Sequence, residues 1–240
     1  MKTIIKKLFN IFGFQISKIS VNNTLAYQTV LALNTNNISV VFDVGANVGQ
    51  FASDLRKYGY LGKIISFEPL PEAYEKIVKQ AVQDANWIVH PRCAIGAYAG
   101  EIKINVAGNS VSSSILPMLK QHLSAAPESQ YTHAETIDLI TIDSVYKKYC
   151  SQDENVFLKV DTQGYEWEVL DGAAETLASC KGVSLELSLV PLYDNQKLWS
   201  DCENRLTKIG FQLYAIQPCF TNLQTGQTLQ VDGLFFKSTN

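Results

Sequence analysis

Short apolar runs alternate along most of this chain with longer segments of helical spacing. Runs that are apolar throughout indicate strands covered on both faces, as in a parallel sheet. The predicted strands are 39–44, 63–67, 87–90, 156–160 and 183–189, and the predicted helices are 49–58, 71–82, 165–178 and 200–209. Two further runs, 211–216 and 231–236, predict an antiparallel hairpin at the sheet edge. We therefore expect an α/β fold with a doubly wound, mostly parallel sheet.

The chain contains no Pro/Gly/Ser-rich linker, and its 240 residues suit one α/β domain. We assign this domain to residues 39–240 and treat residues 1–38 as an N-terminal helical segment. Within the domain, residues 107–133 form an irregular stretch that contains Pro117 and Pro127. Loops of this length are often functional lids, so we predict a lid-like insertion there.

The first residues predict an amphipathic helix whose apolar face holds Ile4, Ile5, Leu8, Phe9 and Phe12. One interpretation is a peripheral membrane or partner contact through residues 3–14. The other is a helix that packs on the body of the domain or on a second subunit of a homo-oligomer. We favour packing, since one short apolar face binds a membrane only weakly. Lys6 and Lys7 interrupt the apolar run, which argues against a secretion signal.

Composition excludes several classes of protein. With 20 basic and 23 acidic residues the net charge is −3, so we expect no nucleic-acid partner. The five cysteines form no CxxC pair, which argues against structural zinc and for reduced thiols in the cytoplasm. The long uncharged stretches 19–42 and 209–231 are rich in Asn, Thr, Gln and Ser, so they predict no membrane span.

The segment VVFDVGANVGQF, residues 40–51, is the strongest functional motif. A buried strand leads into a turn through Gly45 and Gly49, and a helix begins near Gly49, so a ligand can approach the backbone closely. The G-x-G-x-x-G spacing that pyrophosphate binding requires is missing. Asp43, at the strand end, would repel pyrophosphate and suit an ammonium or sulfonium group, which favours S-adenosylmethionine over NAD. A purely structural turn is the alternative.

Glu68 ends the second strand, 23 residues after Gly45. A carboxylate in that place accepts hydrogen bonds from both ribose hydroxyls, and it would serve S-adenosylmethionine or NAD equally well. Glu68 therefore indicates an adenosine ligand, with a role at the start of the following helix as the alternative.

Seven segments together resemble the FkbM family of S-adenosylmethionine-dependent methyltransferases, from about Val40 to Phe236. They are FDVGANVGQF, SFEPLPEAY, CAIGAYAGE, TIDS, FLKVDTQGYEWEVLDGA, LELSLVPLY and VDGLFF. The resemblance implies the Rossmann-like class I methyltransferase fold with a seven-stranded sheet. It also implies that the cofactor binds at the first glycine-rich turn, at the acid after the second strand and at the segment after the third. These positions are Asp43, Gly45, Ala46, Asn47, Gly49, Glu68, Pro69, Cys93 and Ala94. Arg92 departs from the small polar residue often found at its position.

Acids at the carboxyl ends of strands are the candidates for catalysis, because ligands of open α/β sheets bind there. Asp161 follows the strand 156–160 and is interpreted as a general base, a substrate anchor or a metal ligand, with a helix cap as the alternative. Glu186 lies on the polar side of the alternating strand 183–189, where a buried hydrogen-bond network is the alternative. Glu166 is equally consistent with an ordinary helix-start acid. Asp161 and Glu186 together have the oxygen ligands of a Mg²⁺ site, but we predict no metal.

Ser113 and Ser114, with the neighbouring Ser112, and His133 at the far end of the insertion are the candidates for substrate binding. The resemblance implies an O-methyltransferase that acts on a hydroxyl of a sugar, a glycan precursor or a secondary metabolite, so the acceptor is a small molecule or a glycan. The alternatives are a nicotinamide-dependent oxidoreductase and a methyltransferase-like module that binds without catalysis.

Overall fold

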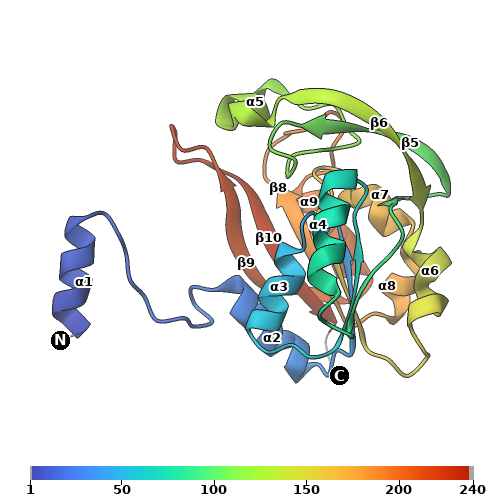
Figure 1. The fold of residues 1–240 in the computed structure, drawn as a ribbon, viewed down its shortest axis with the longest axis horizontal. Coiled ribbons are helices and arrows are strands. Elements are labelled where there is room, and N and C mark those ends of the chain that lie inside the picture. The colour runs from blue at the N-terminus through green and yellow to red at the C-terminus, as the bar shows by residue number, and fades with distance from the viewer. Residues whose placement is uncertain (1, 238–240) are drawn as a thin grey trace.

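The computed structural model describes residues 2–237 and contains a mostly parallel sheet with the strand order β3-β2-β1-β7-β8-β10-β9 (Figure 1). Five strands pair in parallel: β1 (Val40–Val44), β2 (Lys63–Phe67), β3 (Trp87–Val89), β7 (Val156–Val160) and β8 (Gly182–Ser188). The sheet continues as an antiparallel hairpin of β10 (Thr228–Lys237) and β9 (Phe211–Thr221), both longer than their apolar runs. The predicted doubly wound, seven-stranded sheet with a C-terminal hairpin is confirmed for the described residues.

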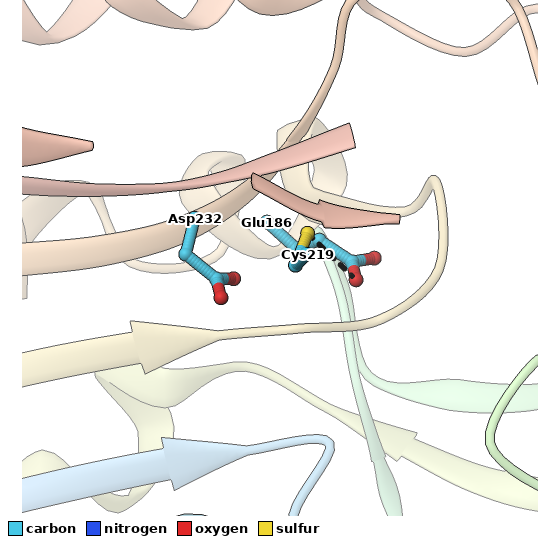
Figure 2. Close-up of side chains that lie close together, drawn as sticks. All are labelled: Glu186, Cys219 and Asp232. Carbon is cyan, nitrogen blue, oxygen red and sulfur yellow. Dashed lines mark hydrogen bonds between the residues drawn. The ribbon is translucent and has the colours of Figure 1, made fainter. Parts of the chain in front are cut away.

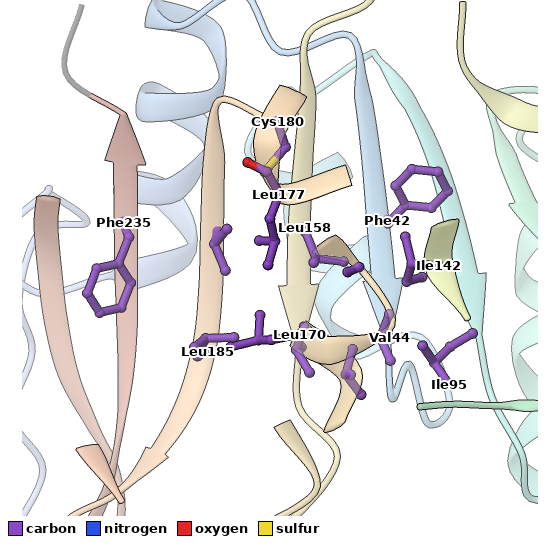
Figure 3. Packing of buried hydrophobic residues seen from close by; sticks show 14 of the residues in the cluster. Phe42, Val44, Ile95, Ile142, Leu158, Leu170, Leu177, Cys180, Leu185 and Phe235 are labelled. Carbon is purple, nitrogen blue, oxygen red and sulfur yellow. The ribbon is translucent and has the colours of Figure 1, made fainter. Parts of the chain in front are cut away.

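Helices cover both faces of this sheet. One face packs against α6 (Ile142–Tyr149), α7 (Glu166–Asp171), α8 (Ala174–Ser179) and α9 (Trp199–Lys208). The other packs against α2 (Leu25–Thr35), α3 (Gln50–Lys57) and α4 (Pro71–Ala81). Successive strand residues alternate between the two cores, as Phe42 does with Val41 and Leu158 with Phe157; Figure 3 shows part of the first core. Both sides of these strands are thus buried, which explains their unbroken apolar runs.

The predicted single helix 165–178 is in fact two helices, α7 and α8. They separate around Gly172, where a Cβ would lie 1.9 Å from the carbonyl oxygen of Gly96. The backbone of another segment therefore occupies the place of a side chain. The Asp143 carboxylate then caps α8, because it accepts hydrogen bonds from the backbone N–H groups of Glu175 and Thr176 at 2.9 and 2.8 Å.

A second, smaller sheet lies beyond the carboxyl ends of the parallel strands (Figure 1). Its order is β4 (Ala94–Ile95), β6 (Tyr131–Ile140) and β5 (Gly100–Ala107). The segment between β5 and β6 holds α5 (Lys120–Ala125) and the short 3₁₀ helix Pro127–Ser129. The expected insertion 107–133 is therefore regular at both ends, because β5 and β6 pair there.

The N-terminal helix α1 (Lys2–Ile11) stands away from the sheet (Figure 1). Ile11 and Phe12 are 78% and 72% exposed, so the favoured packing of this helix on the body is not what the structure shows. Three side chains of the predicted apolar face lie outside what is described: Ile4, Ile5 and Leu8. The next helix, α2, packs into the core, so the packed body begins before residue 39. Within residues 2–237, no helix is both long enough and apolar enough to cross a membrane.

Candidate functional site

A cavity of about 790 Å³ opens at the carboxyl ends of β1, β2, β7 and β8, within the size range of ligand sites in proteins. Its wall includes the turns after β1 and β2, the start of α2 and the insertion between β5 and β6. Among the described lining residues, Lys159 is the one lysine. The lining carboxyl groups belong to Asp54, Glu68, Glu128, Asp161, Glu186 and Asp232. The cavity is therefore acidic.

The turn after β1 requires glycine because two strand ends meet there. Gly45 has φ +72°, and a Cβ on it would lie 1.7 Å from the carbonyl oxygen of Asp161 beyond the end of β7. Asn47 also has a positive φ, 47°, and its side-chain oxygen accepts a hydrogen bond from the backbone N–H of Val48 at 2.7 Å. Gly45, Ala46 and Asn47 line the cavity, where a ligand can approach their backbone.

Two predicted cofactor residues lie behind the cavity wall. The Asp43 carboxylate is fully buried, accepts a hydrogen bond from the Ser66 hydroxyl at 3.0 Å and lies 3.2 Å from the Lys159 ammonium. The pairing of β1 with β7 puts Asp43 opposite Lys159, so its charge is balanced within the protein. The expected pairing of Asp43 with a ligand's ammonium or sulfonium is corrected accordingly. Gly49 faces the Trp87 ring, which fills the space of a Cβ.

Glu68 lines the cavity and is held by the backbone on both sides. Its Oε2 accepts a hydrogen bond from the N–H of Asn47 at 2.7 Å, and its Oε1 accepts one from the N–H of Leu70 at 2.9 Å. Burial raises the pKa of the Glu68 carboxyl to about 7, although these two amides lower it. Each carboxylate oxygen accepts more than one hydrogen bond, so Glu68 keeps lone pairs for the hydroxyls of a ligand.

The remaining predicted cofactor residues, Pro69, Cys93 and Ala94, also line the cavity. Arg92, the departure from the family pattern, extends its guanidinium to 3.6 Å from the Glu135 carboxylate and is not among the lining residues. Its side chain therefore leaves the contacts of Cys93 and Ala94 unobstructed.

The predicted substrate residues do not all lie at the cavity. Ser113 lines the cavity, and its hydroxyl oxygen accepts a hydrogen bond from the N–H of Ala107 at 3.0 Å. Ser114 lies behind the wall, where its buried hydroxyl donates to the carbonyl oxygen of Gln163 at 2.6 Å. His133 is exposed on β6, with Nε2 3.2 Å from Glu135, and it is not brought to the cavity. Ser112 also lines the cavity, so the structure leaves Ser112 and Ser113 as the substrate candidates.

Asp161 presents its carboxylate to the cavity beside a buried cation. Its side chain is 37% exposed, and its Oδ2 lies 3.7 Å from the Lys159 Nζ. Lys159 also donates to the carbonyl oxygen of Gly45 at 3.0 Å. Burial disfavours the charged form of Lys159, but the Asp43 and Asp161 carboxylates outweigh burial and raise the pKa of Lys159 above its ordinary value. Lys159 thus places one positive charge beside the carboxyl groups of Asp43 and Asp161.

Gln163 joins the two predicted catalytic acids. Its Nε2 donates to Asp161 Oδ1 at 2.8 Å and to Glu186 Oε2 at 2.6 Å, while its side-chain oxygen accepts a hydrogen bond from the Tyr193 hydroxyl at 3.0 Å. Burial, with repulsion from Asp161 and Asp232, raises the pKa of Glu186 well above its ordinary value. The protonated form of Glu186 is therefore favoured more strongly than that of a carboxyl group in water.

Three potential metal ligands, Glu186, Cys219 and Asp232, lie close together on β8, β9 and β10 (Figure 2). One oxygen of each acid and the Cys219 Sγ lie within 4.8 Å of one another, so this set could hold an ion. Burial and the Asp161 charge raise the pKa of Asp232 to about 7, and burial also raises the pKa of the Cys219 thiol. Because only the thiolate binds a metal, the raised pKa of Cys219 opposes such a site. The set also differs from the Asp161–Glu186 pair that the sequence suggested.

Sequence reasoning missed Lys159, Gln163 and Asp232. Lys159 carried a usable signal, because a lysine inside an otherwise apolar strand must find a partner when that strand is buried. Asp232 is the acid that ends the uncharged stretch 209–231, which was a weaker signal. Gln163 carried none, since its partners come from distant parts of the chain.

A family model described as the methyltransferase FkbM domain matches residues 43–213. A curated relative, methyltransferase sdnD from Sordaria araneosa, is 27% identical over an alignment of 159 positions, which covers 56% of this chain and 60% of the relative. The chain thus matches less than two thirds of the relative's length. Among solved structures, precorrin-6y C5,15-methyltransferase from Geobacter metallireducens is 13% identical, with a TM-score of 0.47 and 94% of both chains covered. An rRNA methylase from Streptococcus thermophilus is 9% identical, with a TM-score of 0.46, 93% of this chain covered and 100% of that one.

Other solved structures similar to this chain are described as RNA and tRNA methyltransferases. The expectation that the chain has no nucleic-acid partner conflicts with these descriptions and is withdrawn. That expectation rested on the net charge of −3, which describes the whole chain and not the surface around one site.

Proposed function

This chain belongs to the FkbM family of methyltransferases and uses S-adenosylmethionine, and from that premise we propose that it methylates a hydroxyl oxygen of a sugar, a glycan precursor or a secondary metabolite. The observation that carries the proposal is the Asp161 carboxylate, which faces the cavity and lies 3.7 Å from a buried lysine. A hydroxyl nucleophile must lose a proton, and Asp161 is placed to take it.

The cavity residues fit the cofactor. Glu68 has free lone pairs for the ribose hydroxyls, and the turn of Gly45, Ala46 and Asn47 offers a wall without bulky side chains. When bound, S-adenosylmethionine supplies an electrophilic methyl group on a positively charged sulfur. An acidic cavity favours that charge. We assign the cofactor to these residues with Pro69, Cys93 and Ala94.

The two acids take different roles because their surroundings differ. Asp161 lines the cavity and lies beside the Lys159 ammonium, so Asp161 is the general base in our proposal. Burial and acidic neighbours favour the protonated form of Glu186, so in our proposal Glu186 positions the acceptor through a hydrogen bond and does not compete for the proton. Gln163 fixes the distance between the two groups.

Ser113 stands on the insertion side of the cavity, where an acceptor enters in our proposal. The five unpaired cysteines support a reducing, cytoplasmic environment for the reaction.

The test is a transfer assay with methyl-labelled S-adenosylmethionine and a panel of monosaccharides, lipid-linked sugars and hydroxylated metabolites, with the product identified by mass spectrometry. We expect a methyl ether, and Asp161→Asn should lower kcat by about 10²–10⁴-fold. The affinity of the Asp161→Asn variant for S-adenosylhomocysteine, measured by calorimetry, should change little. Asp138→Asn, on an exposed position of β6, is the matched control. Methylation of nitrogen or carbon, or full activity of Asp161→Asn, would refute the proposal.

A further inference from the structure

The N-terminal arm, residues 2–21, exposes an unusual amount of apolar side chain. It comprises α1 and the segment after it, and it extends away from the folded body (Figure 1). Several exposed apolar side chains on one short segment point to an interaction site. The exposed apolar residues are Phe9, Ile11, Phe12, Phe14, Ile16, Ile19 and Val21.

The charge of the arm is opposite to that of the body. Residues 1–42 contain four lysines, at positions 2, 6, 7 and 18, and no acidic residue. The remaining residues then carry 16 basic and 23 acidic side chains, a net charge of −7. Lys6, Lys7 and Lys18 are exposed beside the apolar side chains.

We propose that this arm docks the protein on a bilayer that contains anionic lipid. Lysines interspersed with aromatic and aliphatic residues suit a membrane interface, where the ammonium groups reach the headgroups and the apolar groups enter the acyl boundary. The helix of 10 residues is about 15 Å long, half the thickness of the hydrocarbon core, so it lies in the interface and does not span it. The folded body has a net negative charge, so anionic lipids repel it. The arm is therefore the part of the protein that contacts the bilayer in our proposal.

The arm leads directly to the cavity. Asn23, Thr24 and Leu25 line the cavity wall, and the N–H of Leu25 donates to the side-chain oxygen of Gln217 on β9 at 3.1 Å. A docked arm therefore brings the cavity close to the bilayer. A cavity close to the bilayer suits a methyl acceptor that carries a lipid anchor. This inference about the acceptor rests on the proposed function.

Vesicle flotation of the full chain tests the docking without any need for activity. We expect flotation with vesicles of phosphatidylcholine and phosphatidylglycerol, loss of flotation at high salt, and little flotation with phosphatidylcholine alone. The variant Phe12→Ser/Phe14→Ser should bind at least about tenfold more weakly. Its matched control is Leu61→Ser/Leu223→Ser, which removes two exposed leucines of the body.

A second pair of variants tests the charge. Lys6→Glu/Lys7→Glu should abolish flotation, and Lys147→Glu/Lys148→Glu, an adjacent exposed pair on α6, should not. Equal binding to neutral vesicles, or no binding to either kind, would overturn the proposal. So would a dimer in sedimentation analysis that Phe12→Ser/Phe14→Ser dissociates in the absence of vesicles. Calorimetry of S-adenosylhomocysteine with the same variants should be unchanged, so a failure of docking is distinguishable from a failure of the proposed function.

Discussion

Replacement of Lys159 by methionine should destabilise the protein mainly by leaving Asp43 without its cation. The Asp43 carboxylate is fully buried, and its other polar partner is the Ser66 hydroxyl. Removal of one member of a buried ion pair costs about 3–5 kcal/mol. For a chain of this length, 1 kcal/mol shifts Tm by about 2–4 °C, so we expect Lys159→Met to lower Tm by about 6–20 °C.

The stability of Lys159→Met should also depend on pH in a defined direction. Burial without a neighbouring cation disfavours the charged form of a carboxylate, so the folded Lys159→Met variant should bind protons more readily than the unfolded chain. The stability of Lys159→Met must then fall more steeply from pH 5 to pH 8 than that of the wild type. Urea unfolding at both pH values measures this difference, and Lys103→Met, an exposed lysine on β5, is the control.

A double variant isolates the mechanism. Asp43→Asn added to Lys159→Met removes the unpaired charge, so it should recover most of the lost free energy of unfolding at pH 8. If the single and double variants are equally unstable, or if Lys159→Met shows no extra pH dependence, the loss comes from packing and the ion-pair argument fails.

Three further predictions concern the turn, the buried acids and the bridging amide. Gly45→Ala should abolish folding or S-adenosylhomocysteine binding, because its Cβ would lie 1.7 Å from a backbone oxygen. Gly59→Ala has open space around it and should lower the free energy of unfolding by only about 1–2 kcal/mol, because of its positive φ. Equal losses of stability in the two variants, measured by thermal unfolding, would contradict this prediction. Burial raises the pKa of Glu68 and of Asp232 to about 7, above the values of these groups in the unfolded chain. The wild type should therefore lose stability as the pH rises from about 5 to about 7. A midpoint of urea unfolding that rises over this range would contradict the prediction. Gln163→Leu should lower kcat and shift its pH profile while calorimetry shows unchanged cofactor affinity, and an unaltered profile would remove Gln163 from the mechanism.

The sequence by itself determined the layered fold and the general place of the site. Unbroken apolar runs such as 156–160 require burial on both faces, so they predict a parallel sheet without knowledge of any contact. Glycine at 45 and an acid at 68 are local signals at strand ends, and the carboxyl ends of parallel strands meet at one edge. Gly45, Glu68, Asp161 and Glu186 were therefore predictable as neighbours of one cavity.

Only the tertiary structure decided which groups pair and which face the ligand. Asp43 and Lys159 lie 116 residues apart in sequence, yet strand register puts them opposite each other and takes Asp43 out of the cavity. Asp232 reaches Glu186 because β10 returns antiparallel to β8. The raised pKa of Glu186 follows from that meeting of charges in a buried place. Such couplings depend on register and burial, which arise from packing between distant segments and leave no local trace in the chain.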